Sequence, residues 1–257
     1  MNPLIALKTS QRVLLSAGAS LAAINNAYRA DMVAVTSETL FPEPALKRLT
    51  NHMTCHPVGR RILKERPLLT SKILDDWYDN RIKEIHEKSK DSDETFEKLN
   101  QELAQTFGYQ LMQFFKKANI SLDTRRPVKF TPSSLYIDLK FKNTQRSQEE
   151  IDELSYVLTR YRQVHDILHF LVDKNTKFDG EAELKVFEAI HTKRLPMTVV
   201  GGTIAPMVKL DSERRNKFVN RLSGVCEDAR KTSNVYNVYF EERLDQNVDE
   251  LRAELNL

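Results

Sequence analysis

Glycine is scarce in this chain, with only 7 residues among 257, or about 3% where a soluble domain usually has about 7%. No two glycines stand at the spacing of the G-x-G-x-x-G or G-x-x-x-x-G-K-[ST] loops that hold nucleotide phosphates. The G-x-S-x-G elbow of many hydrolases is absent as well. Because so few residues suit tight turns, the chain is expected to fold as helices joined by polar loops.

The composition fits a single all-α domain that spans residues 1–257. Hydrophobic residues make up 40% of the chain and charged residues 29%, enough to fill a sizeable core and to solvate its outside. Two cysteines, Cys55 and Cys226, provide neither a disulfide framework nor a C-x-x-C zinc motif. The longest apolar stretch, Val13 to Ile24, is shorter than the roughly 18 residues of a membrane span. We therefore expect no transmembrane helix.

Apolar residues recur at helical spacing in most of the chain. The pattern predicts helices near residues 11–26, 44–53, 57–67, 70–89, 96–103, 108–115, 147–172, 180–191, 218–229 and 236–255. No acidic residue precedes Asp31, as in many transit peptides, but an ordinary first helix is the favoured interpretation. Strict alternation between Leu135 and Lys142 predicts one extended segment or a small hairpin.

The segment 116–146 is basic, with eight Lys or Arg residues against two Asp. Such an excess could meet a phosphate or an anionic lipid headgroup, although a solvated surface is the favoured interpretation. Aromatic residues are not interleaved with the basic ones as a nucleic-acid platform requires. We therefore expect no nucleic-acid partner.

The best-defined helix begins after Ser147 and carries residues that commonly bind metals. Ser147 is followed three residues later by a glutamate, the capping-box pattern, and an apolar stripe then continues for about six turns. His165 and His169 stand four residues apart on that face, and Asp166 lies between them. A loop then turns the chain back, so Glu181 in the first turn of the next helix should lie level with this cluster.

Two imidazoles and two carboxylates that face the interior predict a divalent-cation site. His165, Asp166, His169 and Glu181 would be costly to bury without a partner, and a dication supplies one. Mixed nitrogen and oxygen donors suit Zn²⁺, iron or manganese. The alternative is a pair of core histidines that are each bonded to a carboxylate. A zinc protease is disfavoured because the H-E-x-x-H glutamate is replaced by Asp166, whereas an HD-type phosphohydrolase stays a competitor.

Two further features concern the same chemistry. His52, Cys55 and His56 form a weaker metal candidate, but no fourth ligand is nearby and Pro57 ends the helix, so a surface or packing role is favoured. Gly180 directly precedes Glu181, and we predict that it lets the returning backbone close on the metal.

The histidine motif, taken with blocks elsewhere in the chain, resembles the signature of the coenzyme Q (ubiquinone) biosynthesis protein 4 family. The motif is HDILH at 165–169 followed by Glu181. The other blocks are YRADMVAV from Tyr28 with Glu38, GRRILKERP from Gly59, FGY from Phe107, RYRQVHD from Arg160, GEAELKVFEA from Gly180, LPM from Leu195, and VYFEE with DELRAELNL near the C-terminus. The blocks follow one another across nearly the whole chain, which makes the resemblance far more specific than the motif alone.

The resemblance implies an all-α protein, peripheral on the matrix side of the mitochondrial inner membrane, in a complex with other ubiquinone-biosynthesis enzymes. It implies that His165, Asp166, His169 and Glu181 bind a divalent metal, Zn²⁺ first among the choices, and form the catalytic site. The implied reaction is that of a carboxy-lyase of the 4-hydroxy-3-methoxy-5-polyprenylbenzoate decarboxylase type. It removes the C1 carboxylate of a polyprenylated 4-hydroxybenzoate intermediate, with or without hydroxylation at that carbon. The alternative is a non-catalytic scaffold that binds prenylated intermediates and organises the partner enzymes.

Sequence position also suggests how such a substrate could be held. Arg160, Arg162 and Lys185 lie near the site by helical spacing and are candidates to pair with the substrate carboxylate. The Val13 to Ile24 helix is a candidate for a groove that holds the polyprenyl tail. Asp166 and a metal-bound water are both open as the proton donor.

Overall fold

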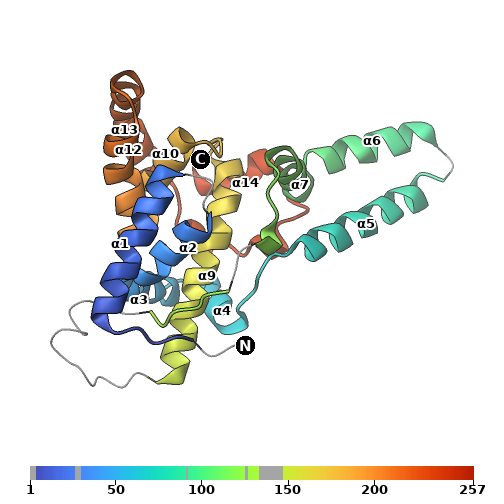
Figure 1. The fold of residues 1–257 in the computed structure, drawn as a ribbon. Coiled ribbons are helices and arrows are strands. Elements are labelled where there is room, and N and C mark those ends of the chain that lie inside the picture. Colours follow the sequence, from blue (N-terminus) through green and yellow to red (C-terminus); the bar gives the residue numbers. More distant parts are fainter. Residues whose placement is uncertain (1–3, 27–29, 91, 125–126, 133–146) are drawn as a thin grey trace.

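The computed structural model describes residues 4–26, 30–90, 92–124, 127–132 and 147–257, and Figure 1 shows that helices build this part of the chain. The helices are α1 (Thr9–Asn25), α2 (Ala30–Thr39), α3 (Glu43–Thr54), α4 (Pro57–Glu65), α5 (Ser71–Lys88), α6 (Asp93–Ala104), α7 (Phe107–Ala118), α9 (Gln148–Leu171), α10 (Phe178–His191), α11 (Pro196–Val199), α12 (Ala205–Lys209), α13 (Ser212–Lys231) and α14 (Val248–Leu255). The described residues contain no strand, only two isolated bridges. The all-α prediction is confirmed, and the extended segment predicted at 135–142 lies outside the described residues.

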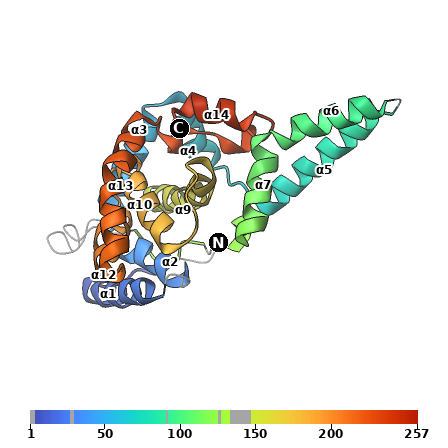
Figure 2. The same cartoon turned by 90° about the horizontal axis from the view of Figure 1, so that it is seen from above.

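Helix α9 forms the centre of the core. From Tyr156 to Leu171 nearly every side chain is buried, and Figure 2 shows α2, α3, α10 and α13 arranged around it. The Ser147 hydroxyl accepts a hydrogen bond from the Glu150 N–H at 3.1 Å and so begins the helix as predicted. The start of α9 shows this Ser147 half of the predicted capping box alone, and the Glu150 carboxylate pairs with Lys47 at 2.6 Å.

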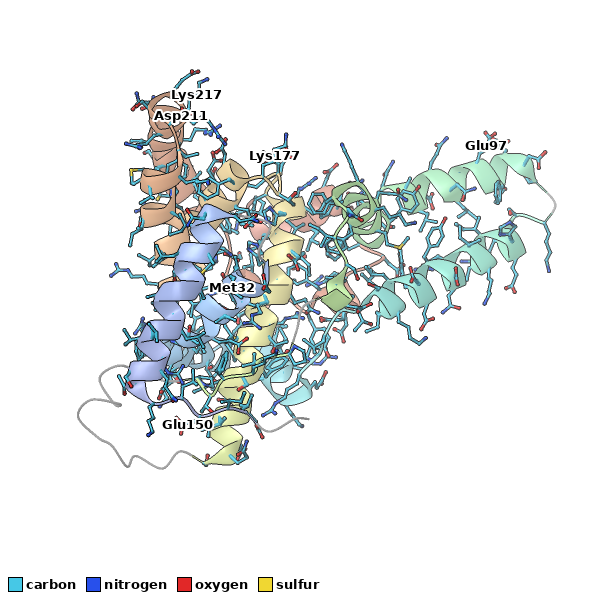
Figure 3. All side chains as sticks on the ribbon, in the orientation of Figure 1. Met32, Glu97, Glu150, Lys177, Asp211 and Lys217 are labelled. Carbon is cyan, nitrogen blue, oxygen red and sulfur yellow. The ribbon has the colours of Figure 1, made fainter. Side chains whose placement is uncertain are left out.

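Helices α5 and α6 form an arm that extends away from this body, as Figures 1 and 2 both show. Thr70 and Ser92 cap the two helices with their hydroxyl groups. Figure 3 places Glu97 far from the other labelled side chains, toward the outer end of α6. The candidate metal ligands lie in the body, on α9 and α10, and not in this arm.

Two helical segments were not expected from the sequence. One is α2, and the other comprises α11, a π-helix at Val200–Ile204 and α12. The glycine pair in VVGGTIAP lowers helix propensity, but here it permits close packing. A Cβ on Gly202 would lie 2.8 Å from the backbone nitrogen of Val186 on α10, so packing against α10 outweighs the weak propensity.

A single final helix over 236–255 was the wrong prediction. The chain instead forms 3-10 turns at Val235–Asn237 and Phe240–Glu242, and α14 begins only at Val248. The buried Arg160 guanidinium donates to the Val238 carbonyl at 3.0 Å and pairs with Glu241. A continuous helix would use that carbonyl for its own hydrogen bond, so the buried arginine favours the irregular path.

A buried ion pair holds α2 against α9. Arg162 on α9 donates to Glu38 at 2.6 Å and to the Ala34 carbonyl at 2.8 Å. Glu38 also accepts from the backbone N–H groups of Lys129 and Phe130, at 2.7 and 2.9 Å. Glu38 and Arg162 are both buried, so their charges satisfy each other and fix the position of α2.

None of the helices in the described part is long and apolar enough to cross a bilayer.

Acid should destabilise the fold through His191 at the end of α10. Burial lowers its pKa to about 4, the Lys193 and His52 charges act in the same direction, and the Ala229 carbonyl and Glu188 oppose them. Because the unfolded side chain takes up its proton near pH 6.5, the unfolded state binds more protons between about pH 6.5 and 4. Stability should therefore fall as pH is lowered through that window, by about 2 kcal/mol at pH 5 from this group. Urea unfolding of wild type and His191→Gln at pH 7.5 and 5 checks this, and equal losses in both proteins would contradict it.

Candidate metal centre

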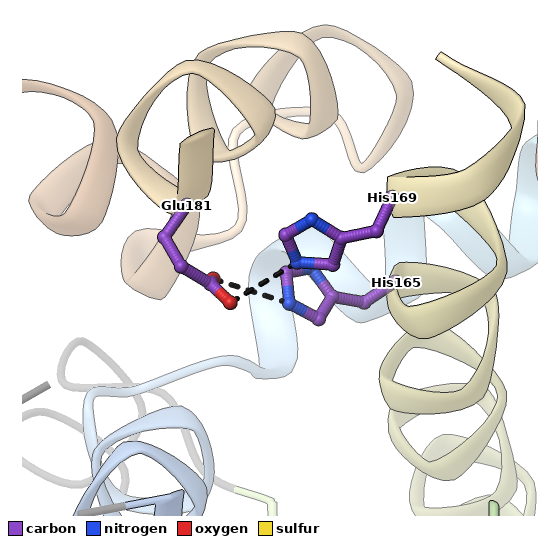
Figure 4. Close-up of side chains that lie close together, drawn as sticks. All are labelled: His165, His169 and Glu181. Carbon is purple, nitrogen blue, oxygen red and sulfur yellow. Dashed lines mark hydrogen bonds and ion pairs between the residues drawn. The ribbon is translucent and has the colours of Figure 1, made fainter. Parts of the chain in front are cut away.

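Three side chains from two helices converge on one point. His165 and His169 extend from α9 and Glu181 from α10 (Figure 4), and their potential ligand atoms all lie within 4.8 Å of one another. The Glu181 oxygens are 3.0 Å from His169 Nε2 and 3.3 Å from His165 Nε2. Both histidines are buried, whereas the Glu181 side chain is 36% exposed. The return of the chain through the loop after α9 thus brings Glu181 level with the histidines, as the sequence predicted.

Asp166 does not belong to this group of three. It is 1% exposed and has interactions of its own, and among the described residues the ligand group comprises His165, His169 and Glu181. Its assignment as a fourth ligand stays a prediction.

The far side of each imidazole ring is held by an acceptor. His169 Nδ1 lies 3.0 Å from the Lys174 carbonyl oxygen, and His165 Nδ1 lies 3.0 Å from Glu188 Oε1. A hydrogen on each Nδ1 satisfies these acceptors and leaves the Nε2 lone pairs free to bind a cation, the usual arrangement of metal-binding histidines. Two imidazoles and one carboxylate also match a common ligand set of catalytic zinc. The residues present therefore fit a divalent metal, with Zn²⁺ well suited to the donors.

Glu188 is the functional candidate that the sequence reasoning missed. It is fully buried, contacts His165, and forms an ion pair with Lys185 at 2.8 Å. Lys185 also donates to the Tyr161 hydroxyl at 2.9 Å. Glu188 lies seven residues after Glu181, two turns further along the same face of α10. This spacing in the sequence could have indicated that Glu188 also faces the histidines.

The pKa shifts reflect an excess of carboxylate around the histidines. Burial and the Lys185 charge lower the pKa of His165, but Glu188 and Glu181 outweigh them and raise it to about 9. Burial raises the pKa of Glu181, but the two histidines hold it well below its usual range. Burial also raises the pKa of Glu188, but Lys185 and His165 bring it down to about 2. Both carboxylates are therefore ionised, and positive charge at this point stabilises them.

All three cations proposed for substrate binding already have a carboxylate partner, and that of Lys185 is Glu188. Arg160 pairs with Glu241, and Arg162 pairs with Glu38. Neither lines the cavity of about 150 Å³ that adjoins the ligand group, whereas Lys185 does. The cavity wall is mostly apolar, and its lining residues are Ser20, Ala23, Ile24, Val33, Thr36, His165, Phe178, Glu181, Ala182, Lys185, Met197, Val200, Gly201 and Ala205.

The weaker candidate at the end of α3 does not form a ligand cluster in the described part of the chain. Cys55 is exposed, and His52 lies 3.3 Å from the side-chain amide of Asn234. These contacts agree with the surface or packing role that the sequence favoured.

Replacing Gly180 with valine should weaken metal retention, because a side chain does not fit there. A Cβ on Gly180 would lie 2.1 Å from the Asn175 carbonyl oxygen in the loop between α9 and α10. Since the φ angle of Gly180 is not positive, the requirement is for space and not for an unusual backbone conformation. The valine should push the start of α10, and Glu181 with it, away from the histidines. Gly224→Val is the matched control, since a Cβ there meets nothing within 4 Å. Zinc content after dialysis should fall only in Gly180→Val, and equal retention in both would contradict this.

Comparisons with known proteins agree with the motif. Residues 2–257 match the family model described as "Coenzyme Q (ubiquinone) biosynthesis protein Coq4". The mitochondrial ubiquinone biosynthesis protein COQ4 homolog of Xenopus tropicalis is 33% identical over 247 residues, or 96% of this chain and 74% of that protein. The homolog of Drosophila pseudoobscura pseudoobscura is 32% identical and covers 98% of this chain and 80% of its own length. A crystal structure of a candidate ubiquinone biosynthesis protein from Nostoc punctiforme shares the fold, with a TM-score of 0.58, 17% identity, and coverage of 93% of this chain and 95% of the other.

Proposed function

The chain belongs to the coenzyme Q (ubiquinone) biosynthesis protein Coq4 family, and we propose that within ubiquinone biosynthesis it is a metal-dependent carboxy-lyase. The proposed substrate is a polyprenylated 4-hydroxybenzoate intermediate, which loses its C1 carboxylate. The observation that carries this proposal is the convergence of His165, His169 and Glu181 beside an apolar cavity. A scaffold does not need such a group, and no observation favours that alternative. The phosphohydrolase alternative predicts a further histidine ligand, which the group of described residues does not contain.

The proposed site would hold the metal through His165, His169 and Glu181, with Asp166 as the proposed fourth ligand. A bound Zn²⁺ would supply Lewis-acid polarisation of the substrate carboxylate or phenolate. Glu188 and the Lys174 carbonyl orient the two imidazoles.

The para-hydroxyl group makes C1 electron-rich, so C1 accepts a proton and the bond to the carboxylate breaks. That electron pair returns to the ring and restores aromaticity, and the products are carbon dioxide and a ring with hydrogen at C1. An oxidative version would place a hydroxyl group at C1, and it would take up dioxygen and water and release hydrogen peroxide together with the carbon dioxide.

A substrate labelled at the carboxyl carbon tests this proposal. The purified zinc-loaded chain should release labelled carbon dioxide from a short-chain prenylated 4-hydroxybenzoate, and the mass of the product tells hydrogen from hydroxyl at C1. Folded His165→Ala protein that releases carbon dioxide at the wild-type rate would contradict the proposal.

The same chain is proposed to lie on the matrix side of the mitochondrial inner membrane as a peripheral protein. Large apolar side chains are exposed on α1 and on the segment 196–209, and these are Val13, Leu14, Leu15, Leu21, Val199, Ile204, Met207 and Val208. Neither α1 nor that segment contains an acidic residue. Both also contribute to the cavity wall through residues such as Ala23 and Gly201. These features support a face that contacts lipid and receives a prenylated substrate from it.

Charge placed on this face should abolish vesicle binding. Leu14 and Val208 are 76% and 68% exposed, so Leu14→Asp/Val208→Asp leaves the core intact. The double variant should bind vesicles with anionic lipid about 100-fold or more weakly, because each of the two apolar side chains withdrawn costs about 1.5 kcal/mol or more. The matched control is Leu68→Asp/Ile73→Asp, which alters two exposed residues at or beside the start of α5. Equal flotation of both variants with vesicles would contradict the assignment.

The proposed partners are other enzymes of ubiquinone biosynthesis, in keeping with the family.

A further inference from the structure

Lys185 places a cation in the wall of the cavity beside the candidate metal ligands. Among the described residues that line this cavity, it is the only Lys or Arg, and it is 5% exposed. We propose that the Lys185 ammonium binds the carboxylate of an aromatic acid in this cavity, and that Gly201 positions the lysine for this role. The inference rests on the proposed function, since that supplies the carboxylate-bearing substrate.

The contacts of Lys185 leave one hydrogen available for such an anion. Its Nζ atom lies 2.9 Å from the Tyr161 hydroxyl, 2.8 Å from Glu188 Oε2 and 2.9 Å from His165 Nδ1. His165 Nδ1 also lies 3.0 Å from Glu188 Oε1, and one ring nitrogen cannot accept from Lys185 and donate to Glu188 together. With His165 Nε2 as a ligand, Nδ1 carries the hydrogen and donates to Glu188. One N–H of Lys185 then needs another acceptor. Because Lys185 lines the cavity, the carboxylate of a bound substrate could accept this hydrogen bond.

Other basic side chains near the site cannot take this role in the observed arrangement. Arg160 and Arg162 pair with Glu241 and Glu38, and neither lines this cavity. Lys174 pairs with Glu183 at 2.9 Å. Burial strengthens the attraction between Lys185 and an anion, because the mostly apolar wall excludes competing water.

Gly201 lies in the π-helix that covers Lys185. A Cβ on Gly201 would be 2.9 Å from Cγ and 3.4 Å from Cβ of Lys185. The aliphatic part of the lysine therefore packs directly on the glycine backbone, and any side chain at 201 would displace it. Short π-helical segments occur often at functional sites, and this one brings a glycine to the residue that faces the ligand group.

Binding of an unreactive acid and its neutral analogue tests this assignment. The probe is 3-prenylbenzoate, which lacks the activating para-hydroxyl group, and its neutral counterpart is 3-prenylbenzamide. Calorimetry with zinc-loaded wild type should show the acid binding about 10- to 100-fold more tightly, the range of a charge-assisted hydrogen bond. Lys185→Met should lose most of this preference and keep only the part that Zn²⁺ itself supplies. Lys217→Met is the control, because that lysine pairs with Glu213 on the exposed face of α13, and it should keep the wild-type preference. A preference for the acid that is as large in Lys185→Met as in wild type would overturn the proposal.

A second variant keeps the test decisive if Lys185→Met fails to fold around the buried Glu188. Gly201→Ala retains every charge, and it should reduce the preference for the acid while zinc content stays at the wild-type level. Gly224→Ala, where a Cβ meets nothing within 4 Å, should change neither. An unchanged preference in Gly201→Ala would equally overturn the proposal. If wild type prefers the acid through Lys185 but releases no carbon dioxide from a reactive substrate, the carboxy-lyase proposal fails and the Lys185 assignment stands.

Discussion

Replacing Glu181 with glutamine should nearly abolish both zinc binding and release of carbon dioxide. Glu181 contributes the carboxylate of the ligand group, and its two oxygens face the two imidazoles at 3.0 and 3.3 Å. Loss of even an outer partner of a metal ligand typically costs about 10- to 100-fold in affinity, so loss of the ligand itself should cost more than about 100-fold. Elemental analysis after dialysis against a weak chelator, together with the labelled-substrate assay, measures both effects.

Two further variants serve as references for the effect of Glu181→Gln on zinc binding. Glu188→Gln keeps the ligands but weakens the support of His165, so its zinc affinity should lie between those of Glu181→Gln and wild type. Glu242→Gln, in the exposed pair with Arg61, should retain zinc and activity. Circular dichroism establishes that each variant is folded. Folded Glu181→Gln protein with wild-type zinc affinity would remove Glu181 from the site.

The second large effect is on stability, and it is expected for Glu38→Gln. Arg162 would then keep its charge in the core without a carboxylate, and removal of one partner from a buried ion pair typically costs about 3–5 kcal/mol. The glutamine also accepts more weakly from the Lys129 and Phe130 N–H groups that Glu38 satisfies. Urea unfolding at neutral pH measures the change in the free energy of unfolding.

The Glu242→Gln variant is again the matched control. It breaks a pair with Arg61 in which both side chains are 47% exposed, and such surface pairs contribute about 1 kcal/mol or less. Similar losses in the two variants would show that the Glu38 pair is not the element that fixes α2. Because Val33 and Thr36 of α2 line the cavity, loosening of α2 should also weaken binding of the 3-prenylbenzoate probe.

The sequence predicted those parts of the fold that local patterns determine. The apolar stripe and the Ser147 cap gave α9, and the i, i+4 histidines with the return of the chain gave the position of Glu181. The C-terminal segment was wrong because a side chain from a distant helix, Arg160, takes the Val238 carbonyl. No local pattern records that competition.

The sequence predicted that His165, His169 and Glu181 lie close together, but not which groups support them. His165, His169 and Glu181 stand in a motif, whereas Glu188 and the Lys174 carbonyl become partners only when α9 and α10 pack together. The roles of the basic residues depended on partners in other helices, since Glu38 and Glu241 neutralise Arg162 and Arg160. Spacing along one helix could not show which of these cations lines the cavity.

Activity as a function of metal occupancy tests the central proposal most directly. Metal-free chain would be prepared with a chelator and titrated with Zn²⁺, and release of carbon dioxide from the labelled prenylated substrate would be followed at each step. The rate should rise in proportion to bound zinc and reach a plateau at one equivalent per chain. A rate that is the same with and without bound metal, or no release at full occupancy, would contradict it.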